Sequence, residues 1–587
     1  MNTKWGIFFL FFFCLFNLKS VMGEEEAEYK GFCGAPLCEN ISFSDAQVRG
    51  SLKFPAAKSI RAAVSAGQTR NFYTYDLARN RILSIPSTCR VVGKNCYIFV
   101  ANSAWSNPGK YFGGREPGEV VTEIAAEYDN TILPLTRSWM GEEPLPPDDI
   151  DGESKVFFLI LDIVDSYSYS GSGGYVAGYF SGNDQKTTAQ YTYSNELDML
   201  YMDCYPAKVA SKNFFSTMAH EFAHLITYKR GAGKELSWIN EGTSTLVQSF
   251  YNPPSLNYKV ASFRENPNIP LVEARWSNIN SIPYYGQSYL FLLHLKNRFG
   301  GRDVAEQQAF IQKLVEEDLP GKDGLEAVTG VDFNQIFEDY SLANGLNLET
   351  ANKGYWGYPE EFDDKLNNDL HLPVKTYYHN LMVDEDKEVS AEVVNWGNRY
   401  YKISGRGTVN LNFEGSDTDG PYVVTLVNIP ISGEPATQTL TLKPDKQGSI
   451  EIPGLGSTVK RVLIRVSAEK DLQGDTGNSA YSFKLSASLK PTMKDLFLAP
   501  LVNPGLGGSH ITMVARMANG FYETPKVQLT VNGIDSTLAM KKVSDSVYHG
   551  SYTFPSGFTG DYTASVTAKI SSSASISKNL SFTHNFK

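Results

Sequence analysis

Hydrophobic periodicity changes twice along the 587-residue chain, and these changes limit which folds the chain can adopt. Between residues 213 and 347 apolar side chains recur at spacings of three and four, which is typical of packed helices. Strand-like runs precede this segment at 70–76, 96–102 and 155–165, with a Gly/Ser/Tyr-rich loop predicted at 166–183. After about residue 375 only short alternating runs remain. The pattern therefore predicts a multidomain protein, with one α+β domain followed by two all-β sandwich modules.

The same changes divide the chain into five predicted segments. They are a signal peptide at 1–23, a polar spacer or pro-segment at 24–68, the α+β domain at 69–360, a β-sandwich at 375–489 and a second, immunoglobulin-like or pre-peptidase-type β module at 490–587. The first segment has a lysine before an apolar run of about ten residues and ends in small side chains, as export signals do. That run is too short to span a bilayer, and no later run is long enough. We therefore expect a secreted or cell-surface protein without a transmembrane segment.

Net charge excludes one class of partner. The formal charge is −11, and no cluster of Lys or Arg occurs along the chain. Because nucleic-acid binding needs a basic face against the phosphates, no nucleic-acid partner is expected.

Cysteine spacing predicts two disulfides. Cys33/Cys38 and Cys89/Cys96 are close pairs, and disulfides are usual in an oxidising compartment. The residues between Cys89 and Cys96 suit a hairpin turn, so that bridge would join two strands. Cys204 is then left over and is expected to be a buried free thiol.

The motif HEFAH provides the strongest functional signal. It places His220 and His224 four residues apart, on one face of the helix that the surrounding sequence predicts. Two imidazoles in that arrangement can bind one metal ion, while Glu221 lies beside the ion without binding it. Ser211 or Asn213 can cap the start of this helix. The alternative is a structural helix that carries two packed or solvated histidines.

A third ligand is predicted on a second helix. A catalytic zinc ion takes three protein ligands and keeps one position open for water. After a Gly-Ala-Gly turn, the run Trp-Ile-Asn-Glu opens another helical segment and brings Glu241 seventeen residues beyond His224. Glu241 is therefore the predicted third ligand of one zinc ion. The alternative is an ordinary first-turn glutamate that the helix dipole stabilises.

These side chains suit the hydrolysis of a peptide bond. Zinc lowers the pKa of a bound water toward about 7, so that Glu221 can accept a proton as the water attacks a carbonyl. Glu221 can then return the proton to the departing amine. The developing oxyanion usually needs a further tyrosine or histidine donor.

Several stretches resemble known metallopeptidases. HEFAH followed by WINEG resembles the gluzincins, the thermolysin-like metallopeptidases; CYIFV, GGYVAGYF, MLYMDCYP and YYGQSYLFLLHLKNRFGG resemble the hyicolysin family of secreted bacterial peptidases. The resemblance spans roughly residues 71–347 and implies a β-rich and a helical half with zinc between them. It implies zinc ligands at His220, His224 and Glu241 and a catalytic base at Glu221.

Two parts of the resemblance leave residues open. In thermolysin an aspartate four residues after the glutamate ligand orients a histidine ligand; Thr245 occupies that position here, so no partner is assigned to His220. The oxyanion donor is predicted to be Tyr285, chosen over Tyr284 and Tyr289. The alternative for each tyrosine is aromatic packing at a helix start.

Three further features have competing interpretations. Asp198 and Asp203 could bind calcium or line the cleft. His294 lies on the apolar face of a predicted helix and is expected to be packed rather than a ligand. The run CGAP, which begins at Cys33, resembles the switch motif of matrix metalloproteinases, in which a thiolate occupies the open zinc position. Because Cys38 is close enough to pair with Cys33, a disulfide is the favoured interpretation.

Two functions are compatible with the sequence. The first is a secreted zinc endopeptidase that cleaves proteins or peptides, with β modules that dock it to substrate, extracellular matrix or the cell surface. The second is a surface-binding protein or adhesin whose β modules carry the function and whose metal site is structural or vestigial. Glu221 favours the first, because a structural site needs no base and fills all four positions with protein ligands.

Overall fold

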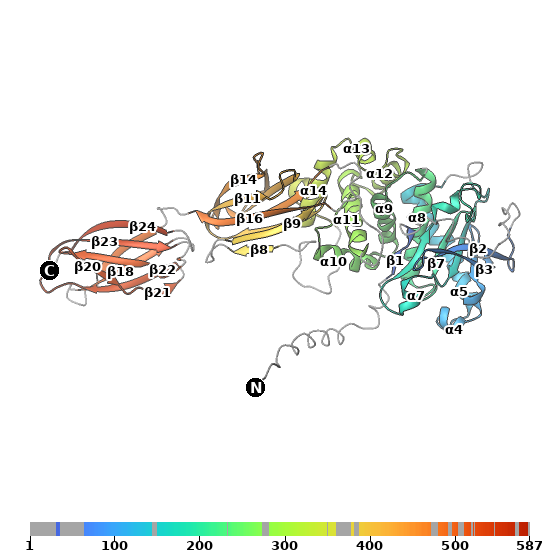
Figure 1. Ribbon diagram of the computed structural model, residues 1–587, viewed down its shortest axis with the longest axis horizontal. Coiled ribbons are helices and arrows are strands. Elements are labelled where there is room, and N and C mark those ends of the chain that lie inside the picture. The colour runs from blue at the N-terminus through green and yellow to red at the C-terminus, as the bar shows by residue number, and fades with distance from the viewer. Residues whose placement is uncertain are drawn as a thin grey trace, which may run out of the picture. The chain divides into compact units, whose positions relative to one another are not determined.

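The computed structural model divides the chain into two compact units. Figure 1 labels their helices and strands. The first contains Met1–Asn266, Leu271–Tyr340 and Tyr358–Pro373, and the second contains Pro267–Pro270, Ser341–Gly357 and Val374–Lys587. The described residues are 31–35, 64–143, 150–231, 233–272, 281–348, 350–359, 377–380, 387–470, 479–490, 496–502, 510–517, 521, 523–544, 546–569 and 575–584. The predicted signal peptide and most of the predicted spacer lie outside these residues, and the predicted domain limits stay predictions. No helix in the described ranges has the length and apolar character needed to cross a membrane.

A seven-stranded sheet forms the β-rich half of the first unit, as far as its described residues go. Its strands are β1 (Gly31–Cys33), β2 (Thr69–Asp76), β3 (Arg81–Val92), β4 (Cys96–Ala101), β5 (Val156–Leu161), β6 (Tyr175–Phe180) and β7 (Met199–Asp203). The strand order is β1-β6-β7-β5-β4-β3-β2, so the N-terminal strand forms one edge, beside β6. The pairs β1/β6, β7/β5 and β5/β4 are parallel, and the other neighbours are antiparallel.

The central strands are apolar because both faces of the sheet are covered. All six residues of β5, VFFLIL, are buried, as are those of β4. Continuous apolar runs are typical of such strands. Tyr128, in the π-helical turn η2 (Tyr128–Ile132), packs on Phe158 of β5 and on Phe222 of helix α8 (Lys212–Arg230). The core of the sheet is therefore continuous with the helix that carries the HEFAH motif.

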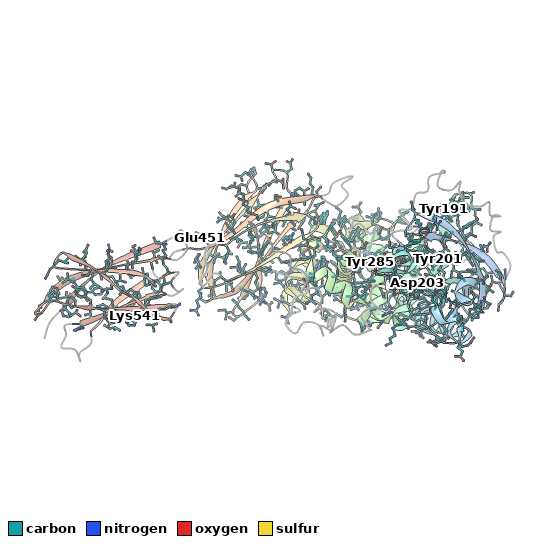
Figure 2. All side chains as sticks on the ribbon, turned by 60° about the horizontal axis from the view of Figure 1, so that its bottom comes forward. Tyr191, Tyr201, Asp203, Tyr285, Glu451 and Lys541 are labelled. Carbon is teal, nitrogen blue, oxygen red and sulfur yellow. The ribbon has the colours of Figure 1, made fainter. Side chains whose placement is uncertain are left out.

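The segment 166–183 is not the loop that its composition predicts. It contains the short helix α7 (Ser166–Ser170) and the strand β6, whose six residues are all buried. Tyr201 of β7 is labelled in Figure 2. The ring of Tyr179 stacks on it at a centroid distance of 4.1 Å. The prediction is wrong for 175–180, because Tyr175 and Tyr179 of this segment are core residues.

Helices form the other half of the first unit. Those around the sheet are α3 (Asn102–Trp105), α4 (Pro108–Tyr111), α5 (Pro117–Glu127), α6 (Leu133–Met140) and the 3₁₀ turn η3 (Gly182–Gln185). The others are α8, α9 (Ser237–Tyr251), η4 (Pro253–Leu256), α10 (Asn257–Glu265), α11 (Ile282–Phe299), α12 (Val304–Glu316), α13 (Gly321–Thr329) and α14 (Phe333–Leu346), which belongs to this unit as far as Tyr340. The packed helices predicted for 213–347 are confirmed in the described part of that segment.

The helix α8 lies between the sheet and the other helices. It is capped by Ser211, whose hydroxyl oxygen accepts a hydrogen bond from the Phe214 amide at 3.2 Å. It contacts β6 and β7 as well as α9, and α9 also contacts α11. At Gly242 of α9, an added Cβ would lie 2.8 Å from the carbonyl oxygen of Ser288 and 2.6 Å from Cδ2 of Leu292, both on α11. Only a residue without a side chain permits this approach of the two helices.

The two predicted disulfides are not found among the described cysteines. The free thiols are Cys33, Cys89, Cys96 and the buried Cys204. Cys38 lies outside the described residues. The strands β3 and β4 form the predicted hairpin, but Cys89 pairs with Phe99, three residues away from Cys96, and a bulge shifts the register next to it. Cys89 and Cys96 therefore do not face each other across the ladder, and this prediction is wrong.

The second unit consists mainly of β-sheet. Its first sheet contains β8 (Tyr377–Asn380), β9 (Lys387–Val394), β10 (Asn398–Ser404), β11 (Gly407–Gly415), β12 (Tyr422–Pro430), β13 (Ala436–Thr439), β14 (Gln447–Leu455), β15 (Val459–Ala468) and β16 (Ala480–Lys490), after the 3₁₀ turn η6 (Ala351–Gly354). Alternate residues of β11 are buried, as the predicted period of two requires. These strands enclose one apolar core that includes Leu411, Val424 and Ile464.

Two four-stranded sheets follow in the same unit. They are built from β17 (Leu496–Val502), β18 (His510–Met517), β22 (Val547–Thr553) and β21 (Lys541–Ser544), and from β20 (Ile534–Leu538), β19 (Lys526–Val531), β23 (Gly560–Lys569) and β24 (Ser575–His584). Side chains from both sheets share a separate core that includes Met513, Leu529 and Val566. An α+β region followed by β-sheet modules is thus confirmed.

Substitution of Gly242 tests the approach of α9 to α11. We expect Gly242→Ala to lower the free energy of unfolding by about 1–3 kcal/mol, because the backbone carbonyl of Ser288 cannot move away without displacing α11. Thermal or denaturant unfolding measures the change. Gly109→Ala is the matched control, because Gly109 lies in the helix α4 and a Cβ added there would meet no atom of the described residues within 4 Å. Equal stabilities of the two variants would contradict the prediction.

Candidate metal centre

Two helices bring the predicted ligands together. His220 and His224 lie one turn apart on α8, and Glu241 is the fifth residue of α9, just past its first turn. Their side chains are no more than 2% exposed, so water does not compete for them. The Nε2 atoms of the two histidines are 3.1 Å apart, and each lies 3.2–3.4 Å from a carboxylate oxygen of Glu241.

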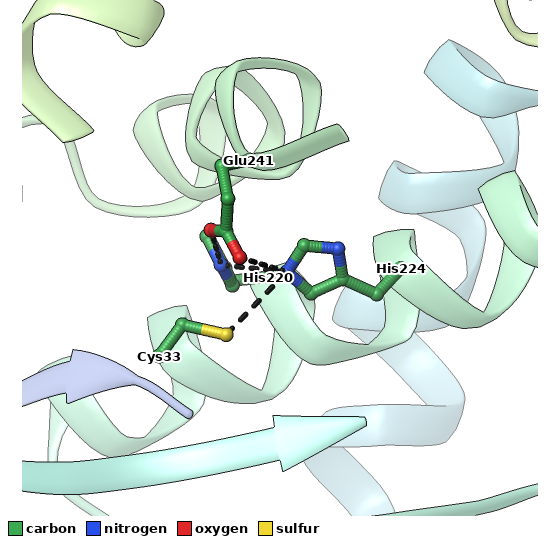
Figure 3. Close-up of side chains that lie close together, drawn as sticks. All are labelled: Cys33, His220, His224 and Glu241. Carbon is green, nitrogen blue, oxygen red and sulfur yellow. Dashed lines mark hydrogen bonds and ion pairs between the residues drawn. The ribbon is translucent and has the colours of Figure 1, made fainter. Parts of the chain in front are cut away.

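A fourth side chain completes the group. The Sγ atom of Cys33, on β1, lies 3.5 Å from Nε2 of His224, and the four ligand atoms all lie within 4.8 Å of one another (Figure 3). The favoured sequence interpretation paired Cys33 with Cys38, and a thiolate in the open zinc position was the alternative. Cys33 is instead a buried free thiol that points toward the histidines and Glu241.

The donor set fits a zinc ion. Bond lengths of about 2.0–2.3 Å in a tetrahedron require ligand atoms about 3.3–3.8 Å apart. The two imidazole Nε2 atoms are 3.1 Å apart, Cys33 Sγ is 3.5 Å from that of His224, and the two oxygens of Glu241 lie 3.2 Å from His220 and 3.4 Å from His224. Imidazole, carboxylate and thiolate are also the ligands that zinc takes in proteins. The group can therefore hold one zinc ion without rearrangement of its helices.

Burial sets the charges of the ligands. It lowers the pKa of His220 to about 3, which keeps this imidazole neutral and its lone pair free for a metal. Burial also disfavours the charged forms of Glu241 and His224, but their mutual attraction outweighs it. Glu241 thus has its pKa lowered to about 2 and His224 has its pKa raised to about 9. The Glu241 carboxylate is consequently ionised at neutral pH, as a metal ligand must be.

Glu221 lies beside the ligands without joining their group. It is fully buried, and burial raises the pKa of its carboxyl group to about 7. The thiol of Cys33 donates to its Oε2 atom at 3.4 Å, whereas Oε1 has no hydrogen-bond partner among the described residues. A carboxyl group with this pKa can both accept and release a proton near neutral pH.

One histidine ligand is oriented by its neighbours. Nδ1 of His224 lies 2.8 Å from Oδ1 of Asn240 and 3.0 Å from Oγ of Ser244. Both partners belong to α9 and flank Glu241, so one helix supplies a ligand and the orientation of another. Nδ1 of His220 has no such partner in the described part of the chain, and neither has the hydroxyl of Thr245.

Tyr285 is the predicted tyrosine that reaches the centre. It is buried on α11, and its hydroxyl donates to the backbone carbonyl oxygen of Cys33 at 2.8 Å. The ammonium group of Lys259, which is buried on α10, lies 4.8 Å from the Tyr285 ring centroid. Burial lowers the pKa of Lys259 to about 8. Sequence reasoning missed Lys259, Asn240 and Ser244, because nothing in their spacing distinguishes them from ordinary helix residues.

The other polar residues considered from the sequence lie in ordinary structural contacts. Asp203 accepts hydrogen bonds from the backbone amides of Ile163 and Ala207, and Asp198 forms an ion pair with Lys229. These contacts use both oxygens of Asp203 and Oδ2 of Asp198, and the calcium site stays a prediction. The His294 ring packs near Tyr340 and Tyr358.

Comparison with known proteins supports a relation to metalloproteases. The chain is 27% identical to the neutral metalloprotease ShpI of Staphylococcus hyicus over 241 residues, which are 38% of this chain and 50% of that protein. The chain thus spans about half the length of the curated relative it matches. No family model matches the chain.

Solved structures add little to this relation. The pre-peptidase C-terminal domain of a Bacillus anthracis collagenase is 7% identical, with 19% of this chain and 95% of that chain covered and a TM-score of 0.15. The adhesin domain of Epf from Streptococcus pyogenes is 12% identical, with 33% and 76% covered and a TM-score of 0.21. Scores this low carry no weight for fold or function.

The orientation of His224 can be tested through metal affinity. The Nδ1–H group of His224 can donate to either of two acceptors, Asn240 Oδ1 or Ser244 Oγ. We therefore expect the remaining acceptor to keep part of the zinc affinity in the single variants Asn240→Ala and Ser244→Ala. The double variant should lower zinc affinity by about 10- to 100-fold, measured by competition with a chromophoric chelator. Ser249→Ala is the matched control, because that hydroxyl donates to the Leu246 carbonyl within the same helix. An unchanged affinity in the double variant would contradict this orienting role.

Proposed function

We propose that the chain is a secreted zinc-dependent metalloendopeptidase of the hyicolysin-like, gluzincin type, which hydrolyses peptide bonds of proteins. The observation that carries the proposal is the buried carboxyl group of Glu221, which lies beside a metal-ligand group and is not needed to complete it. A structural metal site has no use for such a group. The similarity to a neutral metalloprotease supports the same function.

Each residue of the site has a separate role in the proposed reaction. His220, His224 and Glu241 would hold the ion, and a bound zinc ion would lower the pKa of a water molecule toward about 7. Glu221 accepts the proton of the attacking water and delivers it to the departing amine, for which a pKa of about 7 is well matched. Tyr285 donates a hydrogen bond to the carbonyl oxygen under attack. Its present bond to the Cys33 carbonyl supports this assignment, because it is a bond to a peptide carbonyl beside the ligands.

Replacement of the proposed base tests the function directly. We expect Glu221→Gln to reduce the rate of casein hydrolysis by at least about 10²- to 10⁴-fold, because the amide cannot accept the proton. The variant should keep its zinc, measured by elemental analysis, because Glu221 is not a ligand. Removal of zinc by a chelator should abolish hydrolysis in the wild type. Glu119→Gln, an exposed carboxylate on α5, is the control. A fully active Glu221→Gln variant would refute the proposal.

A second substitution tests the oxyanion donor. We expect Tyr285→Phe to lower kcat by about 10²- to 10³-fold with little change in KM, because the hydroxyl would act mainly on the transition state. Tyr289→Phe, one turn further along α11, is the matched control and should retain activity. Steady-state kinetics on a fluorogenic peptide separates kcat from KM. A loss confined to Tyr289→Phe would move the role to that residue.

A further inference from the structure

The segment 31–35 lies on β6 as an added strand. Residues Gly31, Phe32 and Cys33 pair in parallel with Tyr175, Val176 and Gly178 of β6. The amide of Gly34 continues the ladder by donating to the Gly178 carbonyl at 2.9 Å. Without this segment, β6 would be the edge strand of the sheet, with its backbone groups free to bind an extended peptide.

The opposite side of the segment is bound by two tyrosines. The hydroxyl of Tyr285 donates to the Cys33 carbonyl at 2.8 Å, and that of Tyr258 donates to the Gly31 carbonyl at 2.5 Å. The backbone of 31–33 is therefore held between a strand edge on one side and side chains of α10 and α11 on the other. Such contacts recognise an extended backbone and not its side chains, as a site for peptide substrates must.

The thiol of Cys33 occupies the reactive position. Its Sγ atom lies 3.5 Å from His224 Nε2 and 3.4 Å from Glu221 Oε2, between a ligand and the proposed base. That is where the attacking water would have to lie. The group presented to the ligands is a thiol and not a peptide carbonyl, so the segment can fill the site without being cleaved there.

We propose that the segment 31–35 is an internal inhibitor, in which Cys33 is the fourth zinc ligand and β1 fills the peptide-binding edge of β6. The inference rests on the proposed function. The thiol loses its proton to solvent when it binds the ion, because zinc takes the thiolate. Departure of the thiolate, with uptake of a proton or modification of the sulfur, returns the position to water. The peptidase is inactive until the segment leaves the site. A reagent that modifies the Cys33 thiol therefore activates it.

A competing interpretation gives a clear contrast. Four protein ligands also define a structural zinc site. In that case removal of Cys33 would weaken zinc binding and produce no activity, whereas an inhibitory Cys33 can be removed with zinc retained by the three other ligands. The test therefore needs zinc content, the state of the thiol and activity measured on the same proteins.

The first experiment removes the thiol. Full-length wild type and Cys33→Ala, with residue 31 verified as present by mass spectrometry, are compared for zinc content and peptide hydrolysis. We expect Cys33→Ala to retain one zinc ion and to be about 10-fold or more faster, because activity scales with the fraction of molecules whose fourth position is open. Cys204→Ala, which removes another buried free thiol of the same unit, should match the wild type.

The second experiment displaces the strand but keeps the thiol. A Cβ at Gly34 would lie 2.6 Å from Cγ1 of Val176 and 3.3 Å from Cβ of Tyr179, so Gly34→Leu should lift β1 from β6. In the cobalt-substituted protein the thiolate-to-cobalt charge-transfer absorption should be present in the wild type and lost in Gly34→Leu. Cys33 should also react faster with a thiol-modifying reagent in Gly34→Leu than in the wild type. Gly109→Leu, with open space at that position, is the control.

The outcomes separate the two proposals. A wild type that lacks the thiolate absorption, or is already as active as Cys33→Ala, overturns the inhibitor and leaves the peptidase standing. Loss of zinc from Cys33→Ala without a gain in activity also overturns it, in favour of a structural site. The absorption can be present in the wild type and lost in Gly34→Leu while neither the wild type nor any variant hydrolyses a peptide. In that case Cys33 is upheld as a ligand and the peptidase proposal fails.

Discussion

The exclusion of water from Glu241 and the two histidines is the constraint on which the candidate metal centre depends. An ionised carboxylate with 1% of its side chain exposed costs several kcal/mol unless a positive charge compensates it. Without a metal that charge comes from the His224 imidazolium, whose pKa is raised to about 9 because its attraction to Glu241 outweighs burial, and not from His220, whose pKa burial lowers to about 3. A divalent ion can compensate Glu241 and use the lone pairs of both imidazoles. The close approach of α9 to α8 and α11, which buries Glu241, is therefore consistent with a metal that takes the place of the His224 proton.

The local part of this arrangement is readable from the sequence. An i, i+4 pair on a helix shares one face whatever the rest of the fold does, so His220 and His224 follow from spacing alone. The cap at Ser211 is equally local. The prediction of Glu241 as a ligand needed one more inference, that a second helix packs against the first after a short turn. The short connection between the two helices leaves few other residues that could reach the histidines. Continuous apolar runs such as β5 are also recognisable, because burial on both faces leaves no polar positions.

The non-local part was not readable. Cys33 meets Glu221 across 188 residues of sequence, and only the pairing of β1 with β6 brings them together. The strand β6 was itself mistaken for a loop, so the partner that places Cys33 was missing from the prediction. The Cys89/Cys96 disulfide failed for a related reason, since strand register depends on a bulge that spacing does not reveal. Asn240 and Ser244 became visible only when the orientation of the His224 ring was known.

The four ligands differ in how firmly the fold holds them. His220, His224 and Glu241 project from helices of 19 and 15 residues that are buried against the sheet and against each other. Cys33 projects from a strand of three residues at the sheet edge, held by a short ladder and two tyrosine hydroxyls. Edge segments with few buried contacts open at lower free energy than core helices. A permanent structural site gains nothing from one weakly held ligand. A centre that must exchange a thiolate for water needs that asymmetry, because the ion has to stay when the fourth ligand leaves.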